Sequence, residues 1–145
     1  MEEKKNLNIV VVDDEKEDLD IVREVFRSLN TRPSFGNLSV TYSLGIDAAI
    51  TEIISGIANR KPINLLLTDY LMVGTDSKLS QMVYNTDGTG NSLAKFAKER
   101  IPEVKVIGHT GGESSSFDRS YVDLATKKIR DADSLYEKIR EAVGR

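Results

Sequence analysis

Short apolar runs alternate along this chain with stretches in which apolar residues recur at helical spacing. Apolar, β-branched runs of about four to eight residues are typical of buried strands. Five such runs predict strands over Leu7–Val12, Ser39–Ser43, Ile63–Thr68, Val104–Gly108 and Tyr121–Ala125. Four amphipathic stretches predict helices over Asp18–Leu29, Ile46–Ala58, Asn91–Arg100 and Asp131–Val143. Strands and helices therefore alternate along nearly the whole sequence.

The ends and buried faces of these helices also follow from the pattern. The first helix is expected to end at Thr31-Arg32-Pro33, and Asn91 or Ser92 is suited to cap the third. In the second helix the apolar residues predict one inward stripe: Ile46, Ala49, Ile50, Ile53, Ile54 and Ile57. We expect apolar stripes of this kind to form the core.

The alternation of elements predicts the fold class. Buried strands separated by amphipathic helices are typical of a parallel sheet that is covered on both faces. Right-handed crossovers then give a doubly wound α/β fold. Five strands in a chain of this length fit the flavodoxin-like order 2-1-3-4-5, and we expect residues 1–145 to form a single domain.

Two connections depart from this simple alternation. The connection Leu71–Gly90 is long and polar, and Leu79, Met82 and Val83 within it have helical spacing, which predicts one short helix. The connection between Thr110 and Lys127 is short, so the helix expected between the fourth and fifth strands must be stunted or absent.

Composition narrows the class of protein. The net charge is −3, which argues against a nucleic-acid surface, and the chain has no cysteine for disulfide or thiolate chemistry. No apolar run approaches the roughly 20 residues that span a bilayer, and the charged start Met1–Lys5 does not resemble a signal peptide. We therefore expect a cytoplasmic protein that binds neither nucleic acid nor membrane.

Ionisable residues collect where the predicted strands end. The carboxyl ends of parallel strands share one edge of the sheet, and ligands bind there at the point where strand order reverses. Asp13 and Asp14 follow the first strand, Asp69 the third, Thr110 the fourth and Lys127 the fifth. Three carboxylates would thus meet between strands one and three, where their mutual repulsion favours a hard divalent cation such as Mg²⁺.

This set of side chains suits phosphoryl transfer. A carboxylate can attack phosphorus to form an aspartyl phosphate, and a metal ion neutralises the charge that develops on the phosphoryl oxygens. A lysine and a threonine hydroxyl can hold the remaining oxygens. No pair of groups suited to general acid–base hydrolysis of a small molecule accompanies them, so we expect a phospho-acceptor rather than an enzyme with turnover.

Four segments at these strand ends resemble the signature segments of response-regulator receiver domains. They are IVVVDDE (Ile9–Glu15), LLLTDY (Leu65–Tyr70), VIGHTG (Val106–Gly111) and ATKKI (Ala125–Ile129). An Asp-Asp pair after one strand is a weak signal, whereas four segments in the right order are a strong one. The resemblance runs from Asn8 to the last helix.

The resemblance implies a role for each matched position. Asp69 would be the phospho-acceptor, Asp14 a direct Mg²⁺ ligand and Asp13 the carboxylate that holds metal-bound water. Asp69 and the backbone carbonyl of Leu71 would complete the protein's share of the metal shell. Thr110 would be the switch hydroxyl.

The lysine and its neighbourhood depart from the family pattern. Lys127 matches the lysine that pairs with the phosphoryl group, but Lys128 follows where the family usually has proline. Either lysine is therefore a candidate for this contact. Leu124 stands where the family usually has a switch aromatic, for which Tyr121 is a candidate substitute.

The resemblance also implies partners. A sensor histidine kinase or a phosphotransfer protein would supply the phosphoryl group, and an unknown downstream protein would receive the signal from a monomer or weak dimer. The long connection lies beside Asp69, so it is a candidate lid or docking element. As a lid, Met72–Thr89 would gain hydrogen-exchange protection when Mg²⁺ and beryllium fluoride bind.

Three alternatives remain at this point. A degenerate receiver would keep the fold and bind proteins without phosphorylation, which the stunted helix and Lys128 favour. A metal-dependent phosphatase is less favoured because no Asp-x-Asp-x-Thr pattern follows the first strand. A Rossmann oxidoreductase is disfavoured because no Gly-x-Gly-x-x-Gly follows it either.

Overall fold

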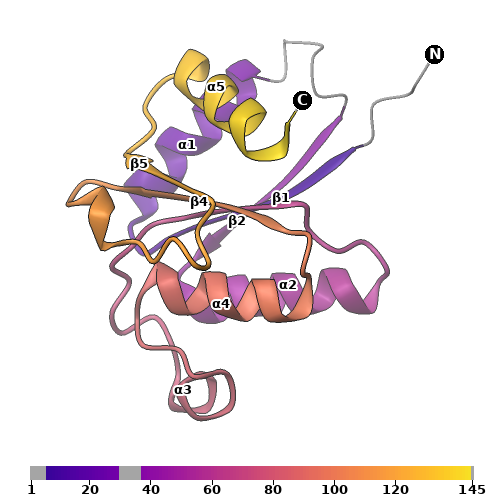
Figure 1. Ribbon diagram of the computed structural model, residues 1–145, viewed down its shortest axis with the longest axis vertical. Helices are drawn as coiled ribbons and strands as arrows, with labels where there is room; N and C mark the ends of the chain where they lie inside the picture. The colour runs from indigo at the N-terminus through magenta and orange to yellow at the C-terminus, as the bar shows by residue number, and fades with distance from the viewer. Residues whose placement is uncertain (1–5, 30–36, 145) are drawn as a thin grey trace.

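The protein is a five-stranded parallel sheet between two layers of helices, in a computed structural model that describes residues 6–29 and 37–144 (Figure 1). The strands are β1 (Leu7–Asp13), β2 (Leu38–Leu44), β3 (Leu65–Thr68), β4 (Lys105–Thr110) and β5 (Leu124–Lys127). Their order is β2-β1-β3-β4-β5, and all four pairings are parallel. The predicted doubly wound sheet is therefore confirmed.

The helices divide between the two faces of the sheet. Helices α1 (Lys16–Leu29) and α5 (Ala132–Val143) cover one face, and α2 (Ile46–Ala58) and α4 (Gly90–Arg100) cover the other (Figure 1). None of the helices in the described ranges is long and apolar enough to cross a membrane. The predicted helix end at Thr31-Arg32-Pro33 and the charged start Met1–Lys5 lie outside the described residues.

Two apolar cores, one on each face of the sheet, explain why the central strands are continuous apolar runs in the sequence. Side chains alternate across a strand, and both faces of this sheet are covered. Val10 and Val12 of β1 pack with α2 and α4, whereas Ile9 and Val11 pack with α1 and α5. Every second residue of β1 therefore enters a different core.

The inward stripe of α2 is narrower than the sequence predicts. The first four residues of the predicted stripe are buried, but Ile54 and Ile57 are 38% and 39% exposed. The prediction that both point inward is wrong. The buried residues of a helix that rests on a sheet occupy one narrow face, and these two isoleucines lie on its flank.

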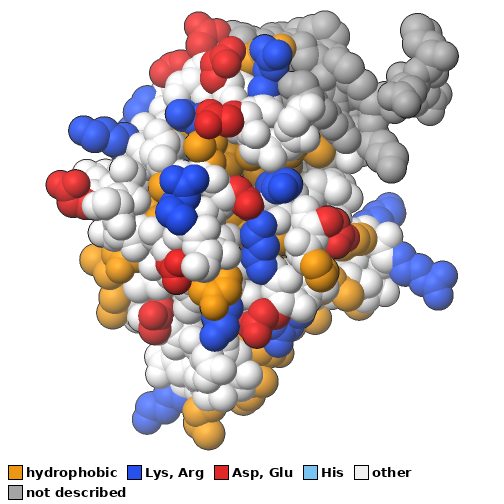
Figure 2. All heavy atoms as spheres, in the orientation of Figure 1, with side chains coloured by type: hydrophobic (Ala, Val, Ile, Leu, Met, Phe, Trp, Pro, Cys, Tyr) orange, Lys and Arg blue, Asp and Glu red, His pale blue; other side chains and the backbone are white. Residues whose placement is uncertain are grey.

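The short helix predicted in the long connection exists, but its apolar stripe is not core. Helix α3 (Lys78–Tyr84) begins after Ser77, whose side chain accepts a hydrogen bond from the Ser80 amide. Leu79, Met82 and Val83 are 69%, 81% and 55% exposed. Figure 1 shows the reason: α3 lies outside the layer that α2 and α4 form, and apolar side chains are visible over it at the lower tip of Figure 2.

Helix α3 is nevertheless fastened to α2. Gly45 precedes α2 and offers no side-chain cap, so Thr75 caps the helix from outside: its hydroxyl and carbonyl oxygens accept hydrogen bonds from the amides of Ile46 and Asp47, at 3.0 and 3.1 Å. The Asp47 carboxylate in turn accepts hydrogen bonds from the Ser77 amide and the Ser80 hydroxyl. The long connection is thus held against the start of α2.

At the other end of α3, aromatic packing attaches the helix to α4. The ring of Tyr84 contacts Phe96 edge to face, with centroids 4.9 Å apart. The Arg100 guanidinium lies 5.1 Å from the Tyr84 ring centroid and 4.0 Å from that of Phe96. One side of α3 is therefore packed, and the other faces outward.

The connection between β4 and β5 holds a single 3₁₀ turn, η2 (Ser114–Ser116), in place of a helix, as predicted. Phe117 covers Gly108 instead: a Cβ on Gly108 would lie 2.6 Å from the Phe117 ring. Gly108, the predicted end of the fourth strand, lies inside β4, which continues to Thr110. The predicted fifth strand was placed too early, because the amides of Tyr121 and Val122 form a turn with the Asp118 carbonyl.

Candidate functional site

Three carboxylates converge where β1 and β3 end. Asp13 is the last residue of β1, Asp14 follows it, and Asp69 follows β3 on the neighbouring strand. One carboxylate oxygen from each lies within 4.8 Å of the others. Asp13 is 1% exposed and Asp69 9%, with Asp14 nearer the solvent. The structure thus brings together the acidic residues that the sequence placed at this edge.

A lysine sits among these acids. The Lys128 ammonium donates a short hydrogen bond to Asp13 and lies 3.3 Å from carboxylate oxygens of Asp18 and of Asp69. The Lys128 side chain is 10% exposed. A buried cation with three carboxylate partners offsets part of the acidic charge.

The resemblance assigned the contact with Asp69 to Lys127, and the structure gives it to Lys128. Lys127 is the exposed last residue of β5, and its register partner is Thr110. Side chains alternate across a strand, so Lys128 points to the opposite side, towards α1. Its amide donates to the Thr110 carbonyl at 3.1 Å, which fixes the backbone at this point. Of the two candidate lysines, Lys128 therefore lies at the site.

Thr110 lies at the same edge, as the last residue of β4. It is 6% exposed, and its hydroxyl oxygen accepts a hydrogen bond from the Gly112 amide at 3.2 Å. A Cβ on Gly111 would have no atom within 4 Å, so the space beside the threonine is open. Thr110 thus ends β4, the strand that neighbours β3 on the side of Asp69.

The backbone near Leu71 leaves one carbonyl available to a cation. Leu71 and Thr89 form an isolated antiparallel bridge, in which the Met72 amide donates to Gly88 and the Gly90 amide donates to Tyr70. This is the pattern of a non-hydrogen-bonded pair, whose own amide and carbonyl groups point away from each other's strand. The Leu71 carbonyl is therefore not used by this bridge.

The electrostatics of the cluster fit a bound cation. Burial raises the pKa of Asp69, although Lys128 opposes the shift, and burial together with Asp13 raises the pKa of Asp14. Burial lowers the pKa of Lys128, but hydrogen bonding to Asp13 and the charges of Asp69 and Asp18 outweigh it and raise the pKa. The donor set contains only oxygen atoms, which is the set that Mg²⁺ prefers. Asp13, Asp14, Asp69 and the Leu71 carbonyl could hold it.

Two residues that position Asp69 were missed by the sequence analysis. The Tyr70 amide donates to Asp69 Oδ1 at 2.8 Å, and the Tyr70 ring meets Phe117 edge to face at 5.4 Å. A Cβ on Gly90 would lie 2.2 Å from the Asp69 carbonyl oxygen. The only sequence signal for this contact is a glycine at the start of a predicted helix, where glycine has no helical advantage.

His109, the single histidine, is a packing residue. It is fully buried, and its Nδ1 accepts a hydrogen bond from the Ile129 amide at 3.4 Å. Burial lowers the pKa of His109 to about 3, so the ring is neutral under ordinary conditions. Among the described residues, it does not belong to the acidic cluster.

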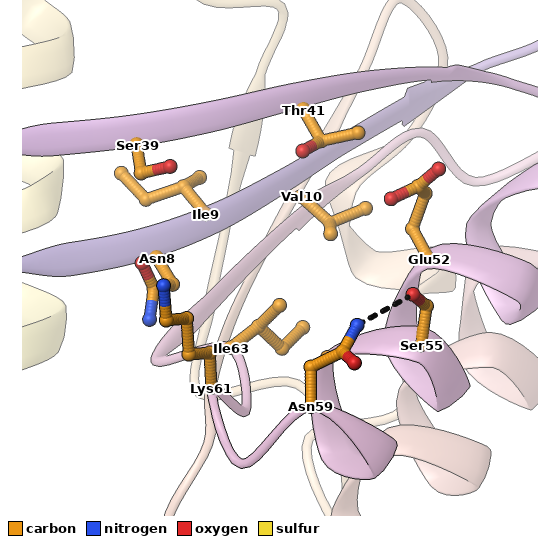
Figure 3. Close-up of a pocket in the computed structure, with 11 residues that line it drawn as sticks. Asn8, Ile9, Val10, Ser39, Thr41, Glu52, Ser55, Asn59, Lys61 and Ile63 are labelled. Carbon is orange, nitrogen blue, oxygen red and sulfur yellow. Dashed lines mark hydrogen bonds between the residues drawn. The ribbon is translucent and has the colours of Figure 1, made fainter.

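A pocket lies at the opposite end of the sheet, between the starts of β1 and β2 and the end of α2 (Figure 3). Its lining includes Asn8, Thr41, and Ser55 and Asn59, which hydrogen-bond to each other. Only two of its lining residues, Glu52 and Lys61, are charged. The chemistry of the strand ends has no counterpart there.

Comparison with known proteins supports the fold. No protein-family model and no curated protein matches the sequence. Among solved structures, the response regulator TrrA of Thermotoga maritima, in complex with Mg²⁺ and BeF, matches with a TM-score of 0.69 and 19% identity, over 94% of this chain and 99% of its own. This chain has the receiver-domain fold.

Two further receiver structures agree. A CheY-like receiver domain protein of Methanospirillum hungatei matches with a TM-score of 0.66 and 23% identity, over 94% of this chain and 93% of its own. The CheX–CheY–BeF₃–Mg²⁺ complex of Borrelia burgdorferi matches with a TM-score of 0.65 and 16% identity, over 93% and 87%. The receiver fold thus spans nearly the whole chain, including the edge that carries the acidic cluster.

Proposed function

We propose that this protein is a phospho-accepting receiver whose Asp69 takes a phosphoryl group in a Mg²⁺-dependent step. The observation that supports this most is the convergence of Asp13, Asp14 and Asp69 within 4.8 Å, with the Lys128 ammonium 3.3 Å from Asp69. A cluster of this composition has a nucleophile, a cation site and a second positive group for phosphate. Solved receivers of the same fold carry Mg²⁺ and beryllium fluoride.

In the proposed step, a carboxylate oxygen of Asp69 attacks the phosphorus of the donor. The new bond is the aspartyl O–P bond, and the bond that breaks is P–N of a phosphohistidine or P–O of acetyl phosphate. The electron pair stays on the leaving group, which takes a proton from solvent where it needs one. Bound Mg²⁺ would supply neutralisation of the charge on the phosphoryl oxygens.

The chain's own residues would orient and hold the groups. The Tyr70 amide fixes one oxygen of Asp69, at 2.8 Å, and so sets the direction of the carboxylate. The Lys128 ammonium lies close enough to Asp69 to form an ion pair with an oxygen of the phosphoryl group once that group is attached. The Thr110 hydroxyl, at the end of the neighbouring strand β4, would turn towards the same group.

The remaining assignments follow from this role. A sensor histidine kinase or a phosphotransfer protein would be the donor, and an unknown protein would read the altered surface. The aspartyl phosphate adds about −1.5 to −2 charges at Asp69. The protein would work in the cytoplasm as a switch that assists its own phosphorylation and dephosphorylation, not as an enzyme with turnover.

Intact-mass measurement with acetyl phosphate tests this function. With Mg²⁺, the parent should gain the mass of one phosphoryl group, and it should gain none without Mg²⁺. Asp69→Ala should gain none, whereas Asp20→Asn, on the exposed face of α1, should behave as the parent does. Absence of any adduct, together with no binding of beryllium fluoride, would contradict the proposal.

A second candidate is a degenerate receiver that binds a protein partner without phosphorylation. The outward face of α3 favours it, because Leu79, Met82 and Val83 are all more than half exposed. Exposed apolar clusters of this kind mark interaction surfaces. A negative phosphorylation experiment, with the fold intact, would favour this candidate.

A further inference from the structure

Asp18 holds the site lysine from outside the acidic cluster. It lies in the first turn of α1, and its two carboxylate oxygens face two different cations. Oδ2 lies 3.3 Å from the Lys128 ammonium, and Oδ1 accepts a hydrogen bond from the Arg130 guanidinium at 3.2 Å. The Asp18 side chain is 17% exposed. This pair of contacts is not visible in the sequence pattern, because Asp18 and Lys128 are far apart along the chain.

The three partners of Lys128 differ in what else can bind them. Asp13 and Asp69 belong to the cluster that fits a divalent cation, and Asp18 does not. A cation on that cluster and the Lys128 ammonium would compete for Asp13 and Asp69. When both carboxylates are taken, Asp18 is the one ion-pair partner left to the lysine among residues 6–29 and 37–144.

We propose that Asp18 is a positioning residue, which keeps the Lys128 ammonium beside Asp69 when a divalent cation occupies Asp13 and Asp69. This inference rests on the proposed function. Without Asp18, the Lys128 ammonium would have no other carboxylate partner in the part of the chain that the structure describes. It would either compete with the divalent cation for Asp13 and Asp69 or turn towards solvent. With Asp18 present, the ammonium can release Asp13 and Asp69 to the cation and still stay in place for the incoming phosphoryl group.

The local structure permits a small shift of the ammonium and little else. Ile129, between Lys128 and Arg130, is 2% exposed and its amide donates to His109, so the backbone is fixed. Leu19, next to Asp18, is buried and holds the start of α1. Burial raises the pKa of Asp18, but Lys128 and Arg130 outweigh it and lower the pKa, so the carboxylate is charged at neutral pH.

Mg²⁺ titration of the full chain by calorimetry tests the competition. Lys128→Met should bind Mg²⁺ about threefold to tenfold more tightly than the parent, because the internal competitor is gone, and Asp18→Asn should bind it more weakly by a similar factor. The double variant should match Lys128→Met, since Asp18 acts through the lysine. Lys127→Met, at the exposed neighbour, should match the parent.

The double variant separates positioning from simple loss of charge. If Asp18→Asn weakens Mg²⁺ binding equally in the parent and in Lys128→Met, Asp18 acts only through its own charge and the inference is overturned. The inference is also overturned if the parent binds Mg²⁺ and Lys128→Met binds it no more tightly; the proposed function would then still stand. If neither the parent nor Lys128→Met binds Mg²⁺, both the inference and the proposed function fail.

Lysine acylation followed by peptide mapping gives a second readout. In the parent, adding Mg²⁺ should change the reactivity of Lys128 by less than about twofold, because Asp18 retains the ammonium. In Asp18→Asn, Mg²⁺ should raise that reactivity several-fold, and Asp18→Glu should restore the parent's behaviour. If Mg²⁺ changed the acylation rate of Lys128 equally in the parent and in Asp18→Asn, the inference would be contradicted.

Discussion

Asp69 of the acidic cluster and helix α3 both follow β3 in the chain, yet the cluster and the helix differ in nearly every physical respect. The cluster is buried, charged and assembled from strands far apart in sequence. Helix α3 is local, carries one charged residue, Lys78, and turns its apolar residues outward. Strand topology thus dictates where a site residue lies, whereas an apolar helical stripe does not reveal whether anything covers it.

The largest expected difference between the regions is in stability. Leu93 of α4 is fully buried, so Leu93→Ala should lower the free energy of unfolding by about 3 kcal/mol through the cavity it leaves. Leu79→Ala makes the same chemical change on α3 and should cost less than about 0.5 kcal/mol. Urea denaturation measures both. A loss above about 1.5 kcal/mol for Leu79→Ala would show that the α3 stripe is packed after all.

The buried region should also respond to acid. The pKa of His109 is about 3 in the fold and about 6.5 in an unfolded chain, so between these values only the unfolded chain is protonated there. Stability should therefore fall as pH drops from about 6.5 towards 3, with about 3 kcal/mol lost between pH 7 and 4.5 from this residue.

His109→Gln isolates that contribution. Glutamine does not titrate, so the variant should lose about 3 kcal/mol less than the parent over the same pH interval. Urea midpoints at the two pH values provide the measurement. Identical pH dependence in parent and variant would mean that the histidine is not buried as a neutral ring.

The backbone beneath Asp69 provides a smaller and more local test. Gly90→Ala places a methyl group 2.2 Å from the Asp69 carbonyl oxygen, so it should cost about 2 kcal/mol of stability and weaken Mg²⁺ binding. Gly111→Ala, where nothing lies within 4 Å, should cost less than about 0.5 kcal/mol. Equal denaturation midpoints for the two variants would rule out the close contact.

Much of the fold and the acidic cluster was predictable because it depends on periodicity and strand order. The continuous apolar character of β1 and β3 indicated a sheet covered on both faces, and this sheet places Asp13 and Asp69 together. No further information about tertiary contacts was needed for that step.

Which of the two lysines contacts Asp69 was not predictable, because a shift of one residue along the strand reverses the side to which a side chain points. Lys127 and Lys128 are adjacent in sequence, but they point to opposite sides, and only Lys128 meets Asp18 and Asp69. The contact of Gly90 with Asp69 likewise arises from how the long connection folds back. The exposure of Ile54 was missed for a related reason, since amphipathicity does not give the width of the buried face.

The smallest expected effect concerns the lid hypothesis, which stays a prediction. Thr75 and Ser77 bind α2 directly, and these contacts already hold the start of α3. We expect hydrogen exchange on addition of Mg²⁺ and beryllium fluoride to slow at Leu71–Val73 and at Gly88–Gly90, and to stay within about twofold at α3. Slowing across all of α3 would instead favour a closing lid.

Borohydride reduction after acetyl phosphate treatment, followed by peptide mapping, tests phosphorylation at its proposed position. Borohydride reduces an aspartyl phosphate to homoserine, so the position of homoserine in the peptide map shows which carboxylate carried the phosphoryl group. We expect homoserine at position 69, only when Mg²⁺ is present and not in Asp13→Asn. Homoserine at another aspartate, or none in a protein that binds Mg²⁺, would contradict the assignment of Asp69 as the phospho-acceptor.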